Sequence, residues 1–347
     1  MPDRKSGWAA TKEVAGRLRD LLTGIASRRR PGLPLSDLLP ILYPSDGRRP
    51  ELLAAAEATL EGRDRAETLA DVRAVLGAFD HQAYPSPVSV RLCRDDIFWH
   101  EDGGIRFALD PQDGAVTPLV LAGNFERHIT AVVHARLRSG SHVVDVGANV
   151  GYHAIRLASL VGPSGSVLAV EPNPDNCRLL QAAVEENGLT NVTLLPVGLG
   201  AARGWRGFTT HVGTNGGLLG DESRSVVRDA GTIVPLLRLD DLVVAGQRVD
   251  LVKIDVEGAE GLVTDGASET IARCRPLVVS ELSFEMLRRV SGVEPRQYLS
   301  RFTALDYEIN VIERDEVGKL TPYASADDLL ARWPSEFHIE DLLLVPH

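Results

Sequence analysis

From residue 141 onward, short continuous apolar runs alternate with segments whose apolar residues recur at helical spacing. Five of these runs predict buried strands at Val143–Val146, Val167–Val170, Val192–Val197, Leu251–Ile254 and Leu277–Val279. Strands that are apolar on both sides and joined by helices are typical of a parallel sheet with helices on both faces. Two further runs, Tyr307–Ile312 and Leu342–Val345, complete a predicted α/β fold with a mostly parallel seven-stranded sheet.

The pattern before residue 85 is different. Apolar residues between Val14 and Ile25 recur at helix-like spacing, and similar segments predict a helical extension over residues 1–84. The α/β domain is predicted to span residues 85–347. Its first elements are predicted as strands at Val88–Leu92, Asp95–His100 and Ile105–Leu109 and a helix at Gly123–Leu137. Because the extension is amphipathic, we expect it to form a lid or the contact of a homodimer.

Composition and charge narrow the classes of function. The 347 residues are 44% hydrophobic and 24% charged, which is ordinary for a globular protein. The formal net charge of −11 argues against a nucleic-acid partner, since phosphate binding requires a basic face. No apolar run approaches the roughly 18 residues of a membrane span, and the first residues lack the apolar core of a secretory signal. Three scattered cysteines form no metal-binding pattern, so we expect a cytoplasmic protein.

A glycine-bearing turn, Asp145–Tyr152, follows the first predicted strand of the sheet. Glycines between a buried strand and a helix let a ligand approach the backbone closely. The second strand ends at Glu171, where a carboxylate can accept hydrogen bonds from a ribose diol. These features predict a nucleoside site at the carboxyl ends of the first two strands.

The type of nucleotide follows from two residues of the turn. Asn149 stands where the dinucleotide motif G-x-G-x-x-G has its second glycine, which disfavours a nicotinamide oxidoreductase. Asp145 would repel a pyrophosphate but would attract the ammonium of an amino acid. A site for an amino acid beside a site for a ribose indicates S-adenosylmethionine. The alternative is a plain tight turn in which Asp145 caps the following helix.

Four motifs carry a resemblance to a known family: D-V-G-A-N-V-G-Y at Asp145–Tyr152, V-E-P-N at Val170–Asn173, L-D-D-L at Leu239–Leu242 and V-K-I-D-V-E-G-A-E at Val252–Glu260. From Phe107 to the C-terminus, the chain resembles the FkbM-type methyltransferases. The resemblance implies the class I methyltransferase fold, which is Rossmann-like, and the cofactor S-adenosylmethionine. It also implies methylation of a hydroxyl on a sugar, a glycoside or another natural product.

The resemblance further implies where the cofactor binds. The glycine turn would surround its methionine part, Glu171 would hold the ribose, Val197 would border the adenine, and the segment ending at Glu126 would close over it. The expected cofactor-binding residues are Glu126, Asp145, Gly147, Ala148, Asn149, Gly151, Tyr152, Glu171, Pro172, Asn173, Val197 and Asp255.

Three carboxylates are the candidate catalytic residues. Asp255 and Glu257 follow the fourth strand, and Glu281 follows the fifth. Because the ends of neighbouring parallel strands meet at one edge of a sheet, we expect all three beside the transferred methyl group. One of them would be the base that takes the hydroxyl proton, or Asp255 and Glu281 would hold Mg²⁺. We favour the base, because no second carboxylate or Asn directly follows Glu281, where catechol-type methyltransferases have a third metal ligand. The alternative is that Asp255 and Glu257 cap the helix that begins near Gly258.

Carboxylates crowded in a dry pocket repel one another. We expect this repulsion to be relieved by a cation, by Lys253 or by a proton held on one carboxylate. Lys253 is therefore expected to pair with a carboxylate. His153 is interpreted as a polar helix residue rather than as a base.

A long insert, residues 200–237, separates the third and fourth strands. Its glycine-rich part, Thr209–Gly220, predicts either a loop over the substrate or a hairpin that turns at Asn215-Gly216. The hairpin strands would be Arg206–His211 and Thr232–Leu236.

The sequence thus predicts an O-methyltransferase with a small-molecule or glycan acceptor. Two alternatives stay open. One is N- or carboxyl-methylation on the same fold. The other is a non-catalytic cofactor-binding partner protein that uses the helical extension as its interface.

Overall fold

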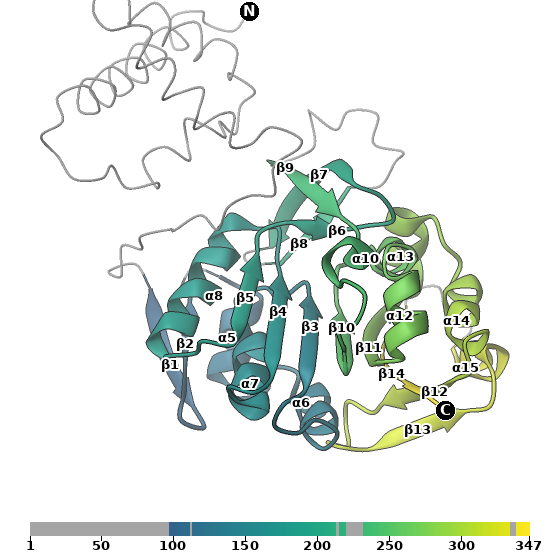
Figure 1. The fold of residues 1–347 in the computed structure, drawn as a ribbon, viewed down its shortest axis with the longest axis horizontal. Coiled ribbons are helices and arrows are strands. Elements are labelled where there is room, and N and C mark those ends of the chain that lie inside the picture. Colours follow the sequence, from purple (N-terminus) through teal and green to yellow (C-terminus); the bar gives the residue numbers. More distant parts are fainter. Residues whose placement is uncertain (1–96, 112, 213–214, 220–231, 334–337) are drawn as a thin grey trace, which may run out of the picture. The chain divides into compact units, whose positions relative to one another are not determined.

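The structure is a computed structural model (Figure 1), and it describes residues 97–111, 113–212, 215–219, 232–333 and 338–347. The helical extension predicted over residues 1–84 and the strand predicted at Val88–Leu92 lie outside the described residues, and both remain predictions. Within the described ranges, no helix is long and apolar enough to cross a membrane.

The central sheet has eight strands. Their bounds are β3 His142–Val146, β4 Ser166–Val170, β5 Val192–Leu195, β10 Leu251–Ile254, β11 Leu277–Ser283, β12 Tyr307–Ile312, β13 Leu320–Tyr323 and β14 Ile339–Pro346. Their order is β13-β12-β14-β11-β10-β3-β4-β5 (Figure 1). The five strands from β11 to β5 in this order are parallel, and β14 lies antiparallel between β11 and β12. All seven predicted strands are present. The prediction misses β13, because its short run contains Pro322, which a sheet tolerates only at an edge.

The strand order determines where a ligand can bind. From β3 the chain reaches β4 and β5 through α7 (Tyr152–Val161) and α8 (Pro174–Glu186). From β10 it reaches β11, on the other side of β3, through α11 (Glu260–Asp265) and α12 (Ser268–Cys274). Because such crossovers are right-handed, the two sets of helices cover opposite faces of the sheet. The chain therefore changes direction between β3 and β10, and open α/β sheets bind ligands at the carboxyl ends of the strands at such a point.

The remaining helices and the hydrophobic core complete the layers around the sheet. The other helices are α5 Val116–Leu121, α6 Arg127–His134, α10 Leu239–Leu242, α13 Phe284–Ser291, α14 Pro295–Thr303 and α15 Ala326–Arg332. Fully buried apolar side chains of adjacent strands, such as Val146, Ile254 and Leu282, form the core of the sheet. The structure thus has the class I methyltransferase fold that the resemblance implies.

The insert after β5 forms a second sheet. Its strands are β6 Gly198–Leu199, β7 Gly204–Val212, β8 Asn215–Leu218 and β9 Thr232–Leu237, in the order β6-β9-β7-β8. The predicted hairpin partners β7 and β9 are indeed antiparallel. The prediction of a turn at Asn215-Gly216 is wrong, because both residues lie in β8 and pair with β7.

The described chain before β3 contains a hairpin and two helices. The hairpin strands are β1 Phe98–Asp102 and β2 Ile105–Leu109, close to their predicted positions. The helix predicted at Gly123–Leu137 is present as α6, but it begins only at Arg127 and ends at His134, and the preceding α5 was not predicted. Gly123 and Glu126 interrupt the helix with φ angles of 65° and 42°, which an α-helix does not accommodate.

Candidate active site

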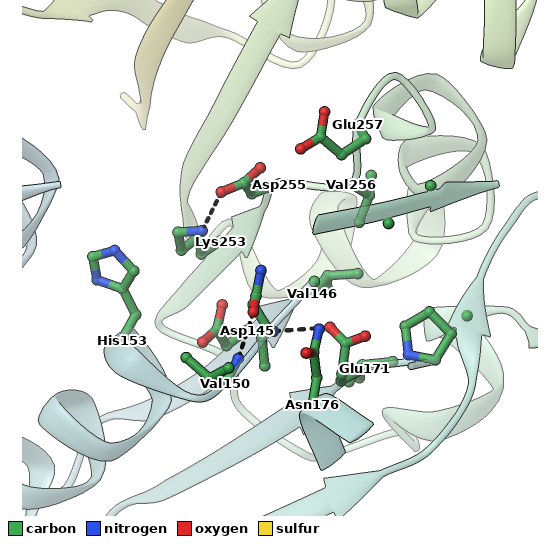
Figure 2. Close-up of a pocket in the computed structure, with 18 of the residues that line it drawn as sticks. Asp145, Val146, Val150, His153, Glu171, Asn176, Lys253, Asp255, Val256 and Glu257 are labelled. Atoms are coloured by element: carbon green, nitrogen blue, oxygen red, sulfur yellow. Dashed lines mark hydrogen bonds and ion pairs between the residues drawn. The ribbon is translucent and has the colours of Figure 1, made fainter. Parts of the chain in front are cut away.

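A pocket opens at the carboxyl ends of β3, β4, β10 and β11 (Figure 2). Its other walls come from α7, from the segment before α6 and from the second sheet. The sequence-predicted residues that line it are Glu126, Asp145, Gly147, Ala148, Asn149, Tyr152, Glu171, Pro172, Val197, Asp255, Glu257 and Glu281. Gly151 and Asn173 do not line it, although both were expected to, and their contacts show why.

The two glycines of the turn have different roles. Gly147 has φ 80°, and a Cβ there would lie 1.8 Å from the backbone oxygen of Asp255. Gly151 has φ 88°, and a Cβ there would lie 2.6 Å from a side-chain carbon of Leu180. Gly147 therefore lets the turn lie against the end of β10 and leaves the pocket open. Gly151 starts α7 and packs on α8, so it supports the turn from behind.

Asp145 is a buried carboxylate that no described residue satisfies. It is 1% exposed, lines the pocket at the end of β3, and neither of its oxygens has a hydrogen-bond partner within the described chain. Burial raises its pKa, while Lys253 and His153 act in the opposite direction. Asp145 does not cap α7, which rules out the plain-turn alternative. An unpaired buried carboxylate facing a pocket fits a ligand that carries a cation and N–H donors.

Glu171 is fixed by the backbone around it. Its Oε2 accepts a hydrogen bond from the Asn149 N–H at 2.8 Å, and its Oε1 accepts one from the Asn173 N–H at 2.7 Å. Burial raises the pKa of Glu171 to about 7, although these bonds and the side chain of Asn176 lower it. Asn173 also caps α8 through the Asp175 N–H, so it holds Glu171 rather than lining the pocket. These three donors leave Glu171 with remaining acceptor capacity for a donor such as a ribose hydroxyl.

These residues fit S-adenosylmethionine. Asp145 provides an unpaired carboxylate for an ammonium, Gly147 lets the turn lie against the end of β10 and lines the pocket, and Glu171 offers a fixed acceptor. Val170, Pro172 and Val197 give the same wall apolar surface of the kind that a purine ring needs.

The three candidate catalytic carboxylates line the same pocket. Asp255 and Glu257 follow β10, and Glu281 lies in β11 (Figure 2 shows the first two). Asp255 and Glu257 do not cap a helix, because α11 begins only at Glu260 and its N-cap residue makes no side-chain cap. The capping alternative is therefore wrong.

Repulsion among these carboxylates is relieved in two of the expected ways. The Lys253 Nζ donates a hydrogen bond to Asp255 Oδ2 at 2.8 Å, as the expected pairing requires. Burial, reinforced by Asp255 and other carboxylates, raises the pKa of Glu281 to about 10, so Glu281 holds a proton at neutral pH. Burial also raises the pKa of Asp255 and the pKa of Glu257. Lys253 opposes this effect at Asp255.

The residues do not fit the expected Mg²⁺. Within the described ranges, no group of three His, Cys, Asp or Glu side chains is placed to hold a metal ion. Lys253 occupies one oxygen of Asp255, and the other expected ligand, Glu281, carries a proton. An ammonium and a neutral carboxyl are poor surroundings for a divalent cation, so no step of the reaction is assigned to one.

A buried network joins the segment before α6 to the strand ends. The His153 Nε2 lies 2.5 Å from Glu126 Oε2, and the Lys253 Nζ lies 4.0 Å from the same oxygen. Although burial alone would raise the pKa of Glu126, Lys253 and His153 lower it to about 2. His153 lies in α7, as interpreted, but it is 6% exposed and lines the pocket.

Sequence reasoning missed several lining residues. They are Val116, Asn176, Leu199 and Phe208. The segment ending at Glu126 and the glycine-rich run were expected beside the ligand, and their residues Phe125, Gly216, Gly217 and Leu218 do line the pocket. Val116, Leu199 and Phe208 carry no local signal, because apolar residues look alike whether they line a pocket or a core.

Comparison with known proteins agrees with this geometry. Residues 145–309 match the Methyltransferase FkbM domain family, and this span contains the glycine turn, Glu171 and the reactive carboxylates. The chain contains an FkbM methyltransferase domain. The match agrees with a site for S-adenosylmethionine.

Individual relatives of the FkbM-type chain match only short stretches. Protein-L-isoaspartate O-methyltransferase of Ignicoccus hospitalis is 42% identical over 61 residues, which are 18% of this chain and 29% of that protein. Catechol O-methyltransferase of Sus scrofa is 40% identical over 58 residues, 17% of this chain and 31% of that protein. The chain thus spans less than a third of the length of either relative. The crystal structure of an FkbM methyltransferase from Methylobacillus flagellatus has 17% sequence identity and a TM-score of 0.38, covering 60% of this chain and 45% of that chain.

Proposed function

We propose that the FkbM-type domain methylates a hydroxyl of a neutral sugar, glycoside or similar natural product, with Asp255 as the base. The observation that carries the proposal is the position of Asp255. It lies in the pocket that holds Asp145 and Glu171, and Lys253 donates to it.

The cofactor supplies a methyl group on a sulfonium that is already a good leaving group. Asp145 accepts hydrogen bonds from the amino-acid ammonium, and Glu171 accepts them from the ribose. The remaining tasks of the chain are to align the acceptor oxygen, to exclude water and to take the hydroxyl proton.

Asp255 is better suited than Glu281 to accept that proton. A carboxyl whose pKa is about 10 is protonated at neutral pH and donates a hydrogen bond instead. The ammonium of Lys253 favours the charged form of Asp255. The acceptor oxygen would bond to the methyl carbon as the methyl–sulfur bond of the cofactor breaks and the sulfide leaves. Asp255 would take the hydroxyl proton, and Glu281 would orient the acceptor by donating to another of its oxygens.

The charge of the pocket favours a neutral acceptor. Glu126, Asp255 and Glu257 line its reactive side beside the protonated Glu281, and Lys253 is the one lysine among the described lining residues. An acceptor with a carboxylate or a phosphate near the reacting hydroxyl would be repelled there. The names of the two relatives described above, which are O-methyltransferases, support oxygen as the acceptor atom.

The acceptor class can be tested with 4-nitrophenyl glycosides of neutral sugars, amino sugars and uronic acids. Mass spectrometry would follow the product after incubation with S-adenosylmethionine. We expect methyl ethers on the neutral glycosides, with kcat/KM at least about tenfold above that for the uronic acids. Methylation only of the amino group or only of the uronic carboxylate would contradict the proposal.

A further inference from the structure

The turn that presents Asp255 and Glu257 has an unusual backbone. Glu257 has φ 53° and Gly258 has φ 97°, so two successive residues adopt the left-handed region. Residues other than glycine seldom adopt this region without support from their surroundings. A Cβ at Gly258 would lie 2.4 Å from the backbone oxygen of Met286, so the turn is also pressed against α13.

Glu260 holds this turn from the inside. Its Oε1 accepts hydrogen bonds from the Val256 N–H at 3.2 Å and from the Gly258 N–H at 3.1 Å. The two donors flank Glu257, so a single carboxylate oxygen fixes both sides of the left-handed residue.

Burying the Glu260 carboxylate in this position is energetically unfavourable. Glu260 is 1% exposed, and its Oε2 has no hydrogen-bond partner within the described chain. A buried oxygen without a partner destabilises a fold, and such groups persist mainly where function requires them.

A second contact holds the turn from the outside. The Ser291 hydroxyl, at the end of α13, donates to the Gly258 backbone oxygen at 2.5 Å. The two contacts engage both backbone groups of Gly258, Glu260 its N–H and Ser291 its carbonyl oxygen.

The geometry points to Glu260 as a positioning residue that fixes the turn 256–258, so that Asp255 and Glu257 face the acceptor. This inference rests on the proposed function, in which Asp255 takes the proton. Glu260 touches neither acceptor nor cofactor, since it is absent from the described pocket lining.

Two substitutions of Glu260 distinguish the effect of the position of its Oε1 from the effect of its charge. Glu260→Gln keeps an acceptor oxygen at the same reach and removes the charge, whereas Glu260→Asp keeps the charge and withdraws the oxygen by one methylene. Glu285→Gln is the control, because Glu285 is exposed on the neighbouring helix α13. The acceptor is the 4-nitrophenyl glycoside that the parent methylates fastest.

We expect Glu260→Gln to keep kcat within about threefold and Glu260→Asp to lower it at least tenfold, since a displacement of about 1 Å can cost a hundredfold. The KM for the glycoside and the affinity for S-adenosylhomocysteine stay within about threefold in both. Amide hydrogen exchange at Gly258 accelerates in Glu260→Asp alone. Equal losses in the two variants, or an unchanged kcat in Glu260→Asp, would overturn the inference.

Two further variants complete the test. If Glu260→Asp does not fold, Ser291→Ala replaces it as the test, because it removes the hydrogen bond to the Gly258 carbonyl oxygen. We expect a lower kcat together with faster amide exchange at Gly258. A Ser291→Ala variant in which both quantities stay unchanged would refute the inference. Asp255→Asn separates this inference from the proposed function. If Asp255→Asn keeps the parental kcat, the proposed base is wrong, while the exchange rates still report whether Glu260 holds the turn.

Discussion

Lys253 connects the stability of the domain to its chemistry, and Lys253→Met removes its charge with little change of shape. The ammonium is 4% exposed, 2.8 Å from Asp255 Oδ2 and 4.0 Å from Glu126 Oε2. At an effective dielectric constant of about 20, unit charges at the shorter distance attract by about 6 kcal/mol. The cost of burying Lys253 offsets part of this attraction. Breaking one side of a buried pair lowers the free energy of unfolding by about 3–5 kcal/mol, because the other charge is left unpaired.

The same substitution also changes turnover. Without the ammonium, the pKa of Asp255 rises further, because Lys253 opposes the effect of burial, so less of the carboxyl group is free to accept a proton. We expect kcat to fall by about a hundredfold or more, as for the loss of a general base. Affinity for S-adenosylhomocysteine stays within a few-fold, since Asp145 and Glu171 are intact.

Urea denaturation and steady-state kinetics measure the two effects. Lys319→Met is the control, because Lys319 lies at the surface and pairs only with groups around Glu316, and its unfolding should match that of the parent. The double variant Lys253→Met/Asp255→Asn should recover much of the stability but none of the activity, since both partners of the pair are then gone. If Lys253→Met is as stable and as active as the parent, the reasoning about this pair is refuted.

Three further predictions follow from the site and the sequence. Since the pKa of Glu281 is raised to about 10, its folded form keeps a proton that the unfolded chain loses above about pH 4.5. Its contribution to stability is therefore lost as pH rises, and Glu281→Gln should be more stable than the parent in urea at pH 8 but not at pH 5. Glu171→Ala should weaken S-adenosylhomocysteine binding in calorimetry by about 1.5–3 kcal/mol, while tight binding of NAD instead would contradict the cofactor assignment. Removal of residues 1–84 should alter turnover or the mass in solution, and a shortened chain that matches the parent in both would refute their predicted role as a lid or dimer contact.

The sheet could be predicted because its strands are buried on both faces. Runs such as Leu251–Ile254 are continuously apolar apart from Lys253, and the structure has strands at all seven predicted positions. The ends of these strands carry the polar residues of the site, so Asp145, Glu171, Asp255 and Glu281 could be named from the sequence. The edge strand β13 could not be named, because an edge accepts residues such as Pro322 that interrupt the pattern.

The contacts that tune the site could not be predicted in the same way. Glu126 precedes α6 and reaches His153 and Lys253 only after the chain has folded, so no spacing in the sequence reveals the network. The break between α5 and α6 was also hidden, because Gly123 and Glu126 stand in a segment that is otherwise helical in pattern. For Glu260, the motif gave the residue but not its bonds to the turn.

The role of Asp255 is the central claim, and methyl transfer by Asp255→Asn in the presence of EDTA tests it most directly. The substrate is a neutral 4-nitrophenyl glycoside, and S-adenosylhomocysteine binding is measured on the same sample. The account predicts that EDTA leaves the parent unaffected, and that the variant binds the cofactor product within a few-fold of the parent but turns over at least about a hundredfold more slowly. A variant that turns over like the parent, or a parent that loses activity in EDTA and regains it with magnesium, would contradict the account.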